Sequence, residues 1–406
     1  MRRRTRFLVG VCGAALLLGA VAWVPAHDPG LHARLIGPYR SLIVGGGPDL
    51  KHNQVAIESN VRYVSRLLPT TSRPRVLFTD GDAESKNVLC EDPDKTTYYR
   101  TPSIPKIDGP SDLAHVRSEL SSISSDANSN PGEPVFLYFT GHGSPDRFSE
   151  YTNNNYDLWN SKHLSVTDFA ASLKSFPKST PITLVMVECF SGAFGNLLFK
   201  DGDAKGDLAD LNICGFFASV APREAAGFTS EVNEANYRDF TSYFFAALSG
   251  IDRLGRPVTG ADYNHDGKVG MNEAFAYSLI HDDSIDTPVC TSDVFLRRFI
   301  TDQKDEQVMA TSFRSVRSWA TPSQLAAIDF LSKSLGLTED DAVSVGYKKF
   351  AAMQPDSMEL DDVHLLRFVR VCKSVILAHK LETTGTESLK ARFAALVKLE
   401  SGNPLR

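Results

Sequence analysis

Residues 133–144, EPVFLYFTGHGS, are the stretch that decides the fold. The six residues from Val135 to Thr140 are apolar or β-branched, so they predict a strand that is buried on both faces. This strand runs directly into His142, which stands between two glycines. Glycine lets a chain turn tightly and lets a second backbone approach closely. The stretch therefore predicts a histidine presented at the carboxyl end of a buried strand.

Similar strands alternate with amphipathic helices along the first three quarters of the chain. Apolar segments predict further strands at 41–47, 74–82, 181–192 and 212–227, with a last one within 286–300. Apolar residues at helical spacing predict helices at 52–68, 109–124, 164–178 and 236–250. Ser165 is expected to cap the third of these helices, with Asp168 completing a capping box. The alternation predicts an α/β domain over residues 35–304, with a mostly parallel sheet covered by helices on both faces.

The pattern changes after about residue 305, where helical periodicity replaces the alternation. Four helical patterns follow one another, at 321–337, 338–353, 361–379 and 386–401. Short polar breaks separate them. We interpret residues 313–400 as a C-terminal all-helical domain.

The N-terminal sequence has the features of an export signal. MRRRTR is followed by an uncharged apolar run from Phe7 to Val24. A charged start, an apolar middle and a small-residue exit are typical of a signal peptide, and the run is also about long enough for a membrane anchor. Residues 1–26 are therefore predicted to be a signal peptide or an N-terminal anchor. The rest of the chain would then be secreted or extracytoplasmic, in a periplasm or envelope.

Charge and cysteine content narrow the classes of function. The net charge of −6 gives no reason to expect nucleic acid as a partner. Five of the six cysteines follow the N-terminal segment, and none of them forms a CxxC pair. This argues against a zinc site or a thioredoxin-like redox site. Because five is odd, at least one thiol is free or pairs between chains.

A second chemically distinctive residue, Cys189, ends the strand predicted at 181–192. It stands 47 residues after His142, about the length of a crossover helix with its neighbouring strand. Chemistry in parallel sheets sits beyond the carboxyl ends of the strands, so the two residues are expected to meet there. Taken singly, a buried cysteine and a loop histidine are ordinary structural residues. Paired, they predict a nucleophile and its proton-transfer partner, with a lowered thiol pKa.

These motifs resemble those of the caspase-like cysteine peptidases, and most closely the legumain branch. LYFTGHGS (137–144) and VECFSG (187–192) are similar to its histidine and cysteine motifs. FTDGDAESKN (78–87), ASVAPREAAG (218–227) and LIVGGGPDLKHNQ (42–54) are similar to its acidic turn, its Pro-Arg-Glu stretch, and its first strand with the pocket loop. The resemblance covers roughly residues 38–250. It implies a caspase-like fold for the α/β domain.

The resemblance also implies roles for particular residues. Cys189 would attack the scissile carbonyl and form a thioester, while His142 would protonate the leaving amine. Backbone N–H groups of Gly143 and Cys189 would receive the oxyanion, and Asp49 or Asn53 would orient His142. Lys51, His52, Glu188 and Arg223 are the residues implied for the substrate pocket. Glu188 directly precedes the cysteine and Phe190 follows it, which departs from the legumain pattern and leaves asparagine specificity open.

Residues 262–273, DYNHDGKVGMNE, fit an EF-hand-like calcium loop at every required position. The predicted oxygen ligands are the side chains of Asp262, Asn264, Asp266 and Glu273, with the backbone carbonyl of Lys268. Gly267 allows the sharp turn that such a loop needs. The segment at 250–260 does not predict an entering helix, so the loop is expected to be single, with a structural role for Ca²⁺.

Three hypotheses about function follow. The first is an exported, calcium-stabilised cysteine endopeptidase that cleaves proteins or peptides. The second is a transpeptidase, or ligase, in which an amine replaces water at the same thioester. The third is a catalytically silent, calcium-binding interaction module. Because legumain-type enzymes carry a C-terminal helical segment over the active site, residues 313–400 would form a cap; a partner-binding module and a stabilising appendage stay open.

Overall fold

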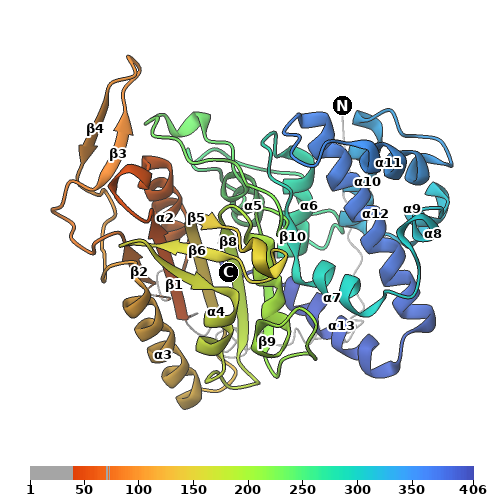
Figure 1. The fold of residues 1–406 in the computed structure, drawn as a ribbon, viewed down its shortest axis with the longest axis horizontal. Coiled ribbons are helices and arrows are strands. Elements are labelled where there is room, and N and C mark those ends of the chain that lie inside the picture. Colours follow the sequence, from red (N-terminus) through yellow and green to blue (C-terminus); the bar gives the residue numbers. More distant parts are fainter. Residues whose placement is uncertain (1–39, 70–71, 73) are drawn as a thin grey trace, which may run out of the picture. The chain divides into compact units, whose positions relative to one another are not determined.

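The structure is a computed structural model that describes residues 40–69, 72 and 74–406. It is an α/β protein with a mixed, mostly parallel sheet and many helices (Figure 1). The predicted signal peptide or anchor at residues 1–26 lies outside the described residues. Within them, no helix is both long and apolar enough to cross a membrane.

The main sheet has the strand order β10-β9-β8-β5-β1-β2. Its parallel strands are β1 (Arg40–Gly46), β2 (Arg75–Phe78), β5 (Val135–Ser144), β8 (Pro181–Val187) and β9 (Asn212–Phe217). Strand β10 (Val289–Cys290) joins the edge antiparallel to β9. The central strands are almost wholly buried, as their unbroken apolar sequences predict. The last strand, predicted within residues 286–300, is the two-residue β10, and the rest of that stretch forms a helix that begins at Thr291.

The four helices that the alternating pattern predicts are present as α2 (Val55–Leu67), α3 (Leu113–Ser129), α4 (Val166–Leu173) and α5 (Phe240–Ser249). Two further helices, α6 (Met271–His281) and α7 (Thr291–Phe299), lie outside this alternation. The crossover through α2 runs from β1 outward to β2, whereas those through α3 and α4 run in the opposite direction across the sheet. Right-handed crossovers therefore place α2 on one face and α3 and α4 on the other. The Ser165 cap of α4 is confirmed, because its hydroxyl accepts a hydrogen bond from the backbone N–H of Asp168.

Two small β elements were not predicted. A hairpin pairs β3 (Val88–Glu91) with β4 (Thr97–Arg100) apart from the main sheet. A second hairpin, β6 (Asn155–Leu158) with β7 (Lys162–Ser165), extends the far end of β5. Residues 142–144 of β5 pair antiparallel with β6, so the strand continues to Ser144 instead of ending at His142. The backbone of His142 therefore stays extended, because His142 pairs with Asp157 of β6.

The four predicted C-terminal helices are present as α10 (Pro322–Ser334), α11 (Ala342–Ala352), α12 (Leu360–Thr384) and α13 (Glu387–Glu400). Two short helices that were not predicted precede them, α8 (Asp305–Val308) and α9 (Phe313–Trp319). They belong to the same compact unit as the sheet. Helix α10 packs on α6, α12 on α7, and α13 on β8 and β9. The C-terminal helices therefore share buried surface with the elements that carry the site.

Candidate active site

The register of the sheet brings His142 and Cys189 to matching positions. Strands β5 and β8 are parallel neighbours, and the last residue pair between them is Thr140 with Val187. His142 and Cys189 each lie two residues further along, so both leave the sheet at the same carboxyl edge. The backbones are also close here: a Cβ on Gly143 would lie 2.2 Å from the carbonyl oxygen of Cys189. Only glycine fits that approach without a shift of the chain.

The imidazole of His142 is oriented by Gln54. Its Nε2 lies 3.0 Å from the amide oxygen of Gln54, the residue that caps α2. Because this amide oxygen only accepts, Nε2 carries the hydrogen and Nδ1 keeps a free lone pair. Burial lowers the pKa of His142, and the nearby His52 lowers it further, so the ring is neutral at neutral pH. A neutral imidazole with a free Nδ1 can accept a proton.

The prediction that Asp49 or Asn53 orients His142 is wrong. Asp49 accepts a hydrogen bond from the ring of His52 at 2.8 Å and caps the short turn Leu50–His52. Asn53 is fully buried and bonds to the backbone N–H of Gly47 and the carbonyl of Asn87. Both side chains are thus engaged inside their own loop. The hydrogen-bond partner of His142 is instead Gln54, which directly follows Asn53. In the sequence, Gln54 could have been found as the polar residue just before the start of α2.

The thiol of Cys189 is partly buried. Its Sγ accepts a hydrogen bond from the backbone N–H of Ala225 at 3.4 Å. Burial raises the pKa of Cys189 to about 11, while the Ala225 N–H acts in the opposite direction. The predicted lowering of this pKa is therefore wrong, because loss of water outweighs the helix that follows, a 3₁₀ helix (Ser191–Leu198). The directions of the two shifts favour a neutral thiol at Cys189 and a neutral imidazole at His142.

Cys189 differs from the other cysteines of the described chain. All five are free thiols, but Cys90, Cys214, Cys290 and Cys372 are buried and Cys189 is partly exposed. An accessible thiol at a strand end is the arrangement that a nucleophile needs, whereas buried thiols behave as small apolar groups. The odd number of cysteines predicts at least one thiol that is free or paired between chains. Among the cysteines that the structure describes, Cys189 is the one that is not fully buried.

A strained residue follows Cys189. Phe190 has a φ of +63°, a left-handed conformation that costs a side-chain-bearing residue about 1–2 kcal/mol. Its N–H donates to the carbonyl of Arg223 at 2.9 Å. The buried amide of Asn154 donates to both the Phe190 carbonyl (3.0 Å) and the Ala221 carbonyl (2.9 Å). The surrounding chain therefore holds the strained turn from two sides, as is typical of functional sites.

Glu188, predicted for the substrate pocket, is instead enclosed beneath Gly143. Its side chain is buried, and neither carboxyl oxygen has a hydrogen-bond partner among the described residues. Burial raises its pKa well above the usual range, and the charge of Asp157 acts in the same direction. Burial therefore favours the protonated, uncharged form of Glu188.

The other residues predicted for the pocket lie around the dyad. Lys51 and His52 are exposed on the turn before α2, and the His52 ring lies 5.8 Å from that of His142. Arg223 lies on the loop that receives Phe190. Its guanidinium donates to the carbonyls of Pro355 (2.6 Å) and Ser357 (2.5 Å), between α11 and α12. The C-terminal helical segment thus contacts the predicted substrate-binding arginine directly.

The calcium loop has the turn that the sequence predicts. Gly267 is left-handed, with φ +84°, and the carboxylate of Asp262 accepts from the N–H groups of Asp266 and Gly267. Glu273 accepts from the N–H groups of Tyr263, Asn264 and Gly270. Helix α6 follows, and no helix enters the loop, since α5 ends at Ser249.

This loop has ligand atoms of the right kind for a metal ion, but the structure does not gather its acidic side chains around one point. Its donors are all oxygens, which Ca²⁺ prefers. However, nowhere in the described residues do three or more His, Cys, Asp or Glu side chains gather in a way that could hold a metal. The carboxylates instead bond to the loop's own backbone. A carboxylate oxygen has two lone pairs, so each can keep such a bond and also bind an ion.

No protein-family model matches this chain, and no curated protein matches it. Among solved structures, it is similar to the crystal structure of protein GSU0716 from Geobacter sulfurreducens, at 14% sequence identity and a TM-score of 0.37. The similarity covers 62% of this chain and 92% of that one. So weak a likeness carries no argument about function.

Proposed function

We propose that the chain is an exported cysteine endopeptidase with a caspase-like sheet, acting through Cys189 and His142. The observation that carries the proposal is the matching register of the two residues on adjacent parallel strands. The hydrogen bond from His142 to Gln54 and the close approach at Gly143 support it. The proposal of export depends on residues 1–26, whereas the proposal of activity depends on the site at Cys189 and His142. Either proposal can hold if the other fails.

The proposed reaction begins from the neutral pair. As Cys189 Sγ attacks the peptide carbonyl, His142 Nδ1 takes the thiol proton, because the thiol's pKa of about 11 leaves little free thiolate at neutral pH. The imidazolium then gives that proton to the leaving amine, and a thioester remains. Water, deprotonated by His142, attacks the thioester and releases the acid and the free thiol. Gln54 keeps the ring in place through both proton transfers.

Charge develops on the substrate oxygen during both attacks. The backbone N–H groups of Gly143 and Cys189 are the proposed donors to it. Burial favours the uncharged form of Glu188 beneath them, which reduces its repulsion of the oxyanion. Lys51, His52 and Arg223 are the proposed contacts to the substrate around this centre. The carbonyls of Pro355 and Ser357 occupy Arg223, which supports the proposal that residues 313–400 cap the site. Activation on cutting the chain within 353–359 would support the cap.

The test of the proposed function is digestion of a peptide library, with and without Ca²⁺. We expect the wild-type chain to cleave and both Cys189→Ala and His142→Ala to be inactive. Cys214→Ala is the matched control, because Cys214 is a buried thiol on the next strand, and it should keep activity. Cleavage that persists in Cys189→Ala would refute the proposal. Adding an amine acceptor separates the endopeptidase from a transpeptidase, which would form an amide-linked product.

One observation favours a second candidate, the catalytically silent calcium-binding module. A thiol whose pKa is raised to about 11 reacts slowly by itself. In that case Cys189 would be alkylated at the same rate with and without His142. A rate that falls in His142→Ala would exclude the silent module.

Loss of the Gln54 contact should affect turnover more than substrate binding. We expect Gln54→Ala to lower kcat about tenfold, roughly the effect of losing one hydrogen bond to the imidazole, with little change in KM. Gln54→Glu places a carboxylate on Nε2, which raises the pKa of His142 and moves the acidic limb of the pH–rate profile upward. Steady-state kinetics across pH measure both effects. An unchanged profile in Gln54→Glu would show that this side chain does not orient His142.

We also propose that Ca²⁺ binds Asp262, Asn264, Asp266, Glu273 and the carbonyl of Lys268 and has a structural role. At about ten times its dissociation constant, an ion that binds only the folded chain adds about 1.4 kcal/mol to the free energy of unfolding. We expect Ca²⁺ to raise the Tm of the wild type and not that of Asp262→Ala. Asp207→Ala, at an exposed aspartate, is the control and should respond like the wild type. An identical wild-type Tm in Ca²⁺ and in chelator would contradict the site.

A further inference from the structure

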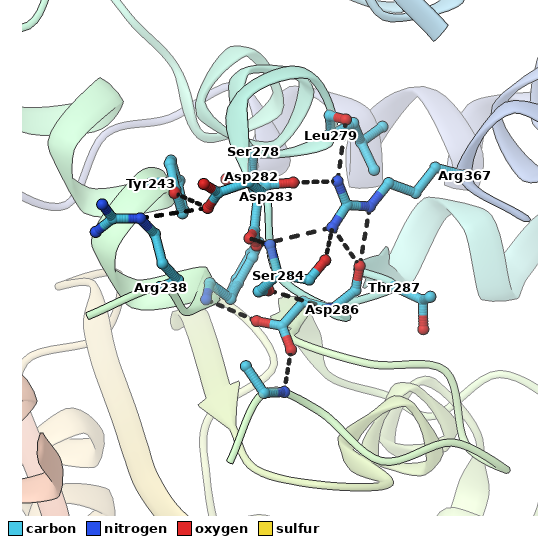
Figure 2. Close-up of polar contacts among 12 residues, drawn as sticks. Arg238, Tyr243, Ser278, Leu279, Asp282, Asp283, Ser284, Asp286, Thr287 and Arg367 are labelled. Atoms are coloured by element: carbon cyan, nitrogen blue, oxygen red, sulfur yellow. Dashed lines mark hydrogen bonds and ion pairs between the residues drawn. The ribbon is translucent and has the colours of Figure 1, made fainter. Parts of the chain in front are cut away.

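A short buried segment, Ser284–Thr287, connects the C-terminal helices with the loop around Cys189. It lies between the end of α6 and the start of β10. Asp286 and Thr287 are almost fully buried, and both use their side chains in hydrogen bonds outside the segment. Figure 2 shows this segment with Arg367 on one side and the backbone reached by Asp286 on the other.

Arg367 of α12 fixes the main chain of this segment. Its side chain is 1% exposed, and its guanidinium donates only to backbone carbonyls (Figure 2). Nη1 donates to the Asp282 carbonyl at 2.6 Å, while Nε and Nη2 donate to the Asp286 carbonyl at 2.9 and 2.6 Å. A planar fork that binds carbonyl groups sets the path of the chain. The position of Asp286 therefore depends on a residue of the C-terminal helices.

The side chains of Asp286 and Thr287 hold the two ends of the loop 219–226. Asp286 Oδ1 accepts from the N–H of Ala226 at 2.6 Å, and Oδ2 accepts from the N–H of Phe240 at 2.8 Å. The hydroxyl of Thr287 accepts from the N–H of Val220 at 3.3 Å. These contacts anchor the loop at both of its ends.

The same loop touches the nucleophile at two points. The N–H of Ala225 donates to Cys189 Sγ, and the carbonyl of Arg223 accepts from the N–H of Phe190. Ala225 directly precedes Ala226, the residue that Asp286 binds. A continuous run of contacts therefore leads from Arg367 to Asp286, from Asp286 to the N–H of Ala226, and from the neighbouring N–H of Ala225 to the sulfur.

We infer that Asp286 is a positioning residue for Cys189 and that Arg367 holds Asp286 in place, so that the C-terminal helices complete the nucleophile's site. The inference rests on the proposed function, because the property being positioned is the reactivity of the thiol. The Ala225 N–H stabilises negative charge that develops on sulfur, and Asp286 keeps this N–H directed at it. A freely removable cap would have no such role.

The test measures alkylation of Cys189 by iodoacetamide across pH in the full-length chain, with the Cys189 peptide quantified by mass spectrometry. In Asp286→Asn, the amide oxygen still accepts from one of the two N–H groups, that of Ala226 or that of Phe240. The amide NH₂ faces the other N–H and cannot accept from it. We expect this variant to be alkylated about three- to tenfold more slowly at neutral pH, even though removing the Asp286 charge by itself lowers the pKa of Cys189. Asp283→Asn is the matched control, an exposed aspartate on the same turn, and should match the wild type.

The outcomes separate the inference from the proposed function. If His142→Ala does not change wild-type alkylation of Cys189, the proposed function fails. If alkylation depends on His142 but a folded Asp286→Asn variant reacts like the wild type, the inference fails. Should Asp286→Asn not fold, Arg367→Lys takes its place, because lysine keeps the charge and loses the fork. An unchanged pH profile in folded Arg367→Lys would overturn the inference equally.

Discussion

Gly143→Ala is expected to lower kcat/KM of the proposed peptidase by about a hundredfold, since a shift of about 1 Å at a catalytic group has effects of that size. The added Cβ would lie 2.2 Å from the carbonyl oxygen of Cys189 and 2.8 Å from Cγ of Glu188. Neither neighbour can yield easily, because one is backbone and the other is a buried side chain. The strand that carries His142 must therefore move away from Cys189.

Gly227→Ala is the control for this substitution. Gly227 directly follows Ala226, and no atom lies within 4 Å of the Cβ that alanine would add there. It should keep its activity, its Tm and its rate of Cys189 alkylation. Gly143→Ala should lose activity even where its far-ultraviolet spectrum shows a folded chain. If the two variants were equally active, the close approach of the two strand ends would have no part in the chemistry.

The sheet was predictable because its evidence is local. Strands β1, β5, β8 and β9 are buried on both faces, so each appears in the sequence as an unbroken apolar run. The two hairpins lack this signal. Strand β4 (TYYR) is largely exposed and β3 is half-buried, so neither has an apolar run. The pairing of β6 with the end of β5 depends on residues beyond the glycines, which sequence periodicity does not reveal.

The placement of the two candidate residues was predictable in part. His142 and Cys189 follow apolar runs, and the expected adjacency of their strands is confirmed by the pairing of β5 with β8. Gln54 was missed because the choice among three neighbouring polar residues depends on how the turn before α2 is wound. Asp286 acts on Ala226, 60 residues earlier in the chain, and no local pattern connects them. The pKa of Cys189 was mispredicted because burial is a property of the whole fold.

The largest expected effect on stability concerns Glu400, at the end of α13. Its carboxylate is 3% exposed and accepts from the hydroxyl of Thr291 and the N–H of Ser292, both at 2.7 Å. Burial raises its pKa from 4.5 to about 7. Between these pH values the folded protein holds a proton that the unfolded chain has lost. The free energy of unfolding therefore falls as pH rises through that window and stays lower above it.

Glu400→Gln removes this titration while its amide oxygen still accepts from Thr291 and Ser292. A pKa difference between 4.5 and about 7 corresponds to about 3 kcal/mol, so the variant should gain up to that amount over the wild type as pH rises through the window. Urea denaturation at about pH 5 and about pH 8 would show the gain as a flatter pH dependence. Glu387→Gln, at an exposed position of the same helix, should keep the wild-type slope. Parallel pH dependence in Glu400→Gln and the wild type would mean that Glu400 is ionised in the folded chain, and that α13 does not exclude water from the end of β10.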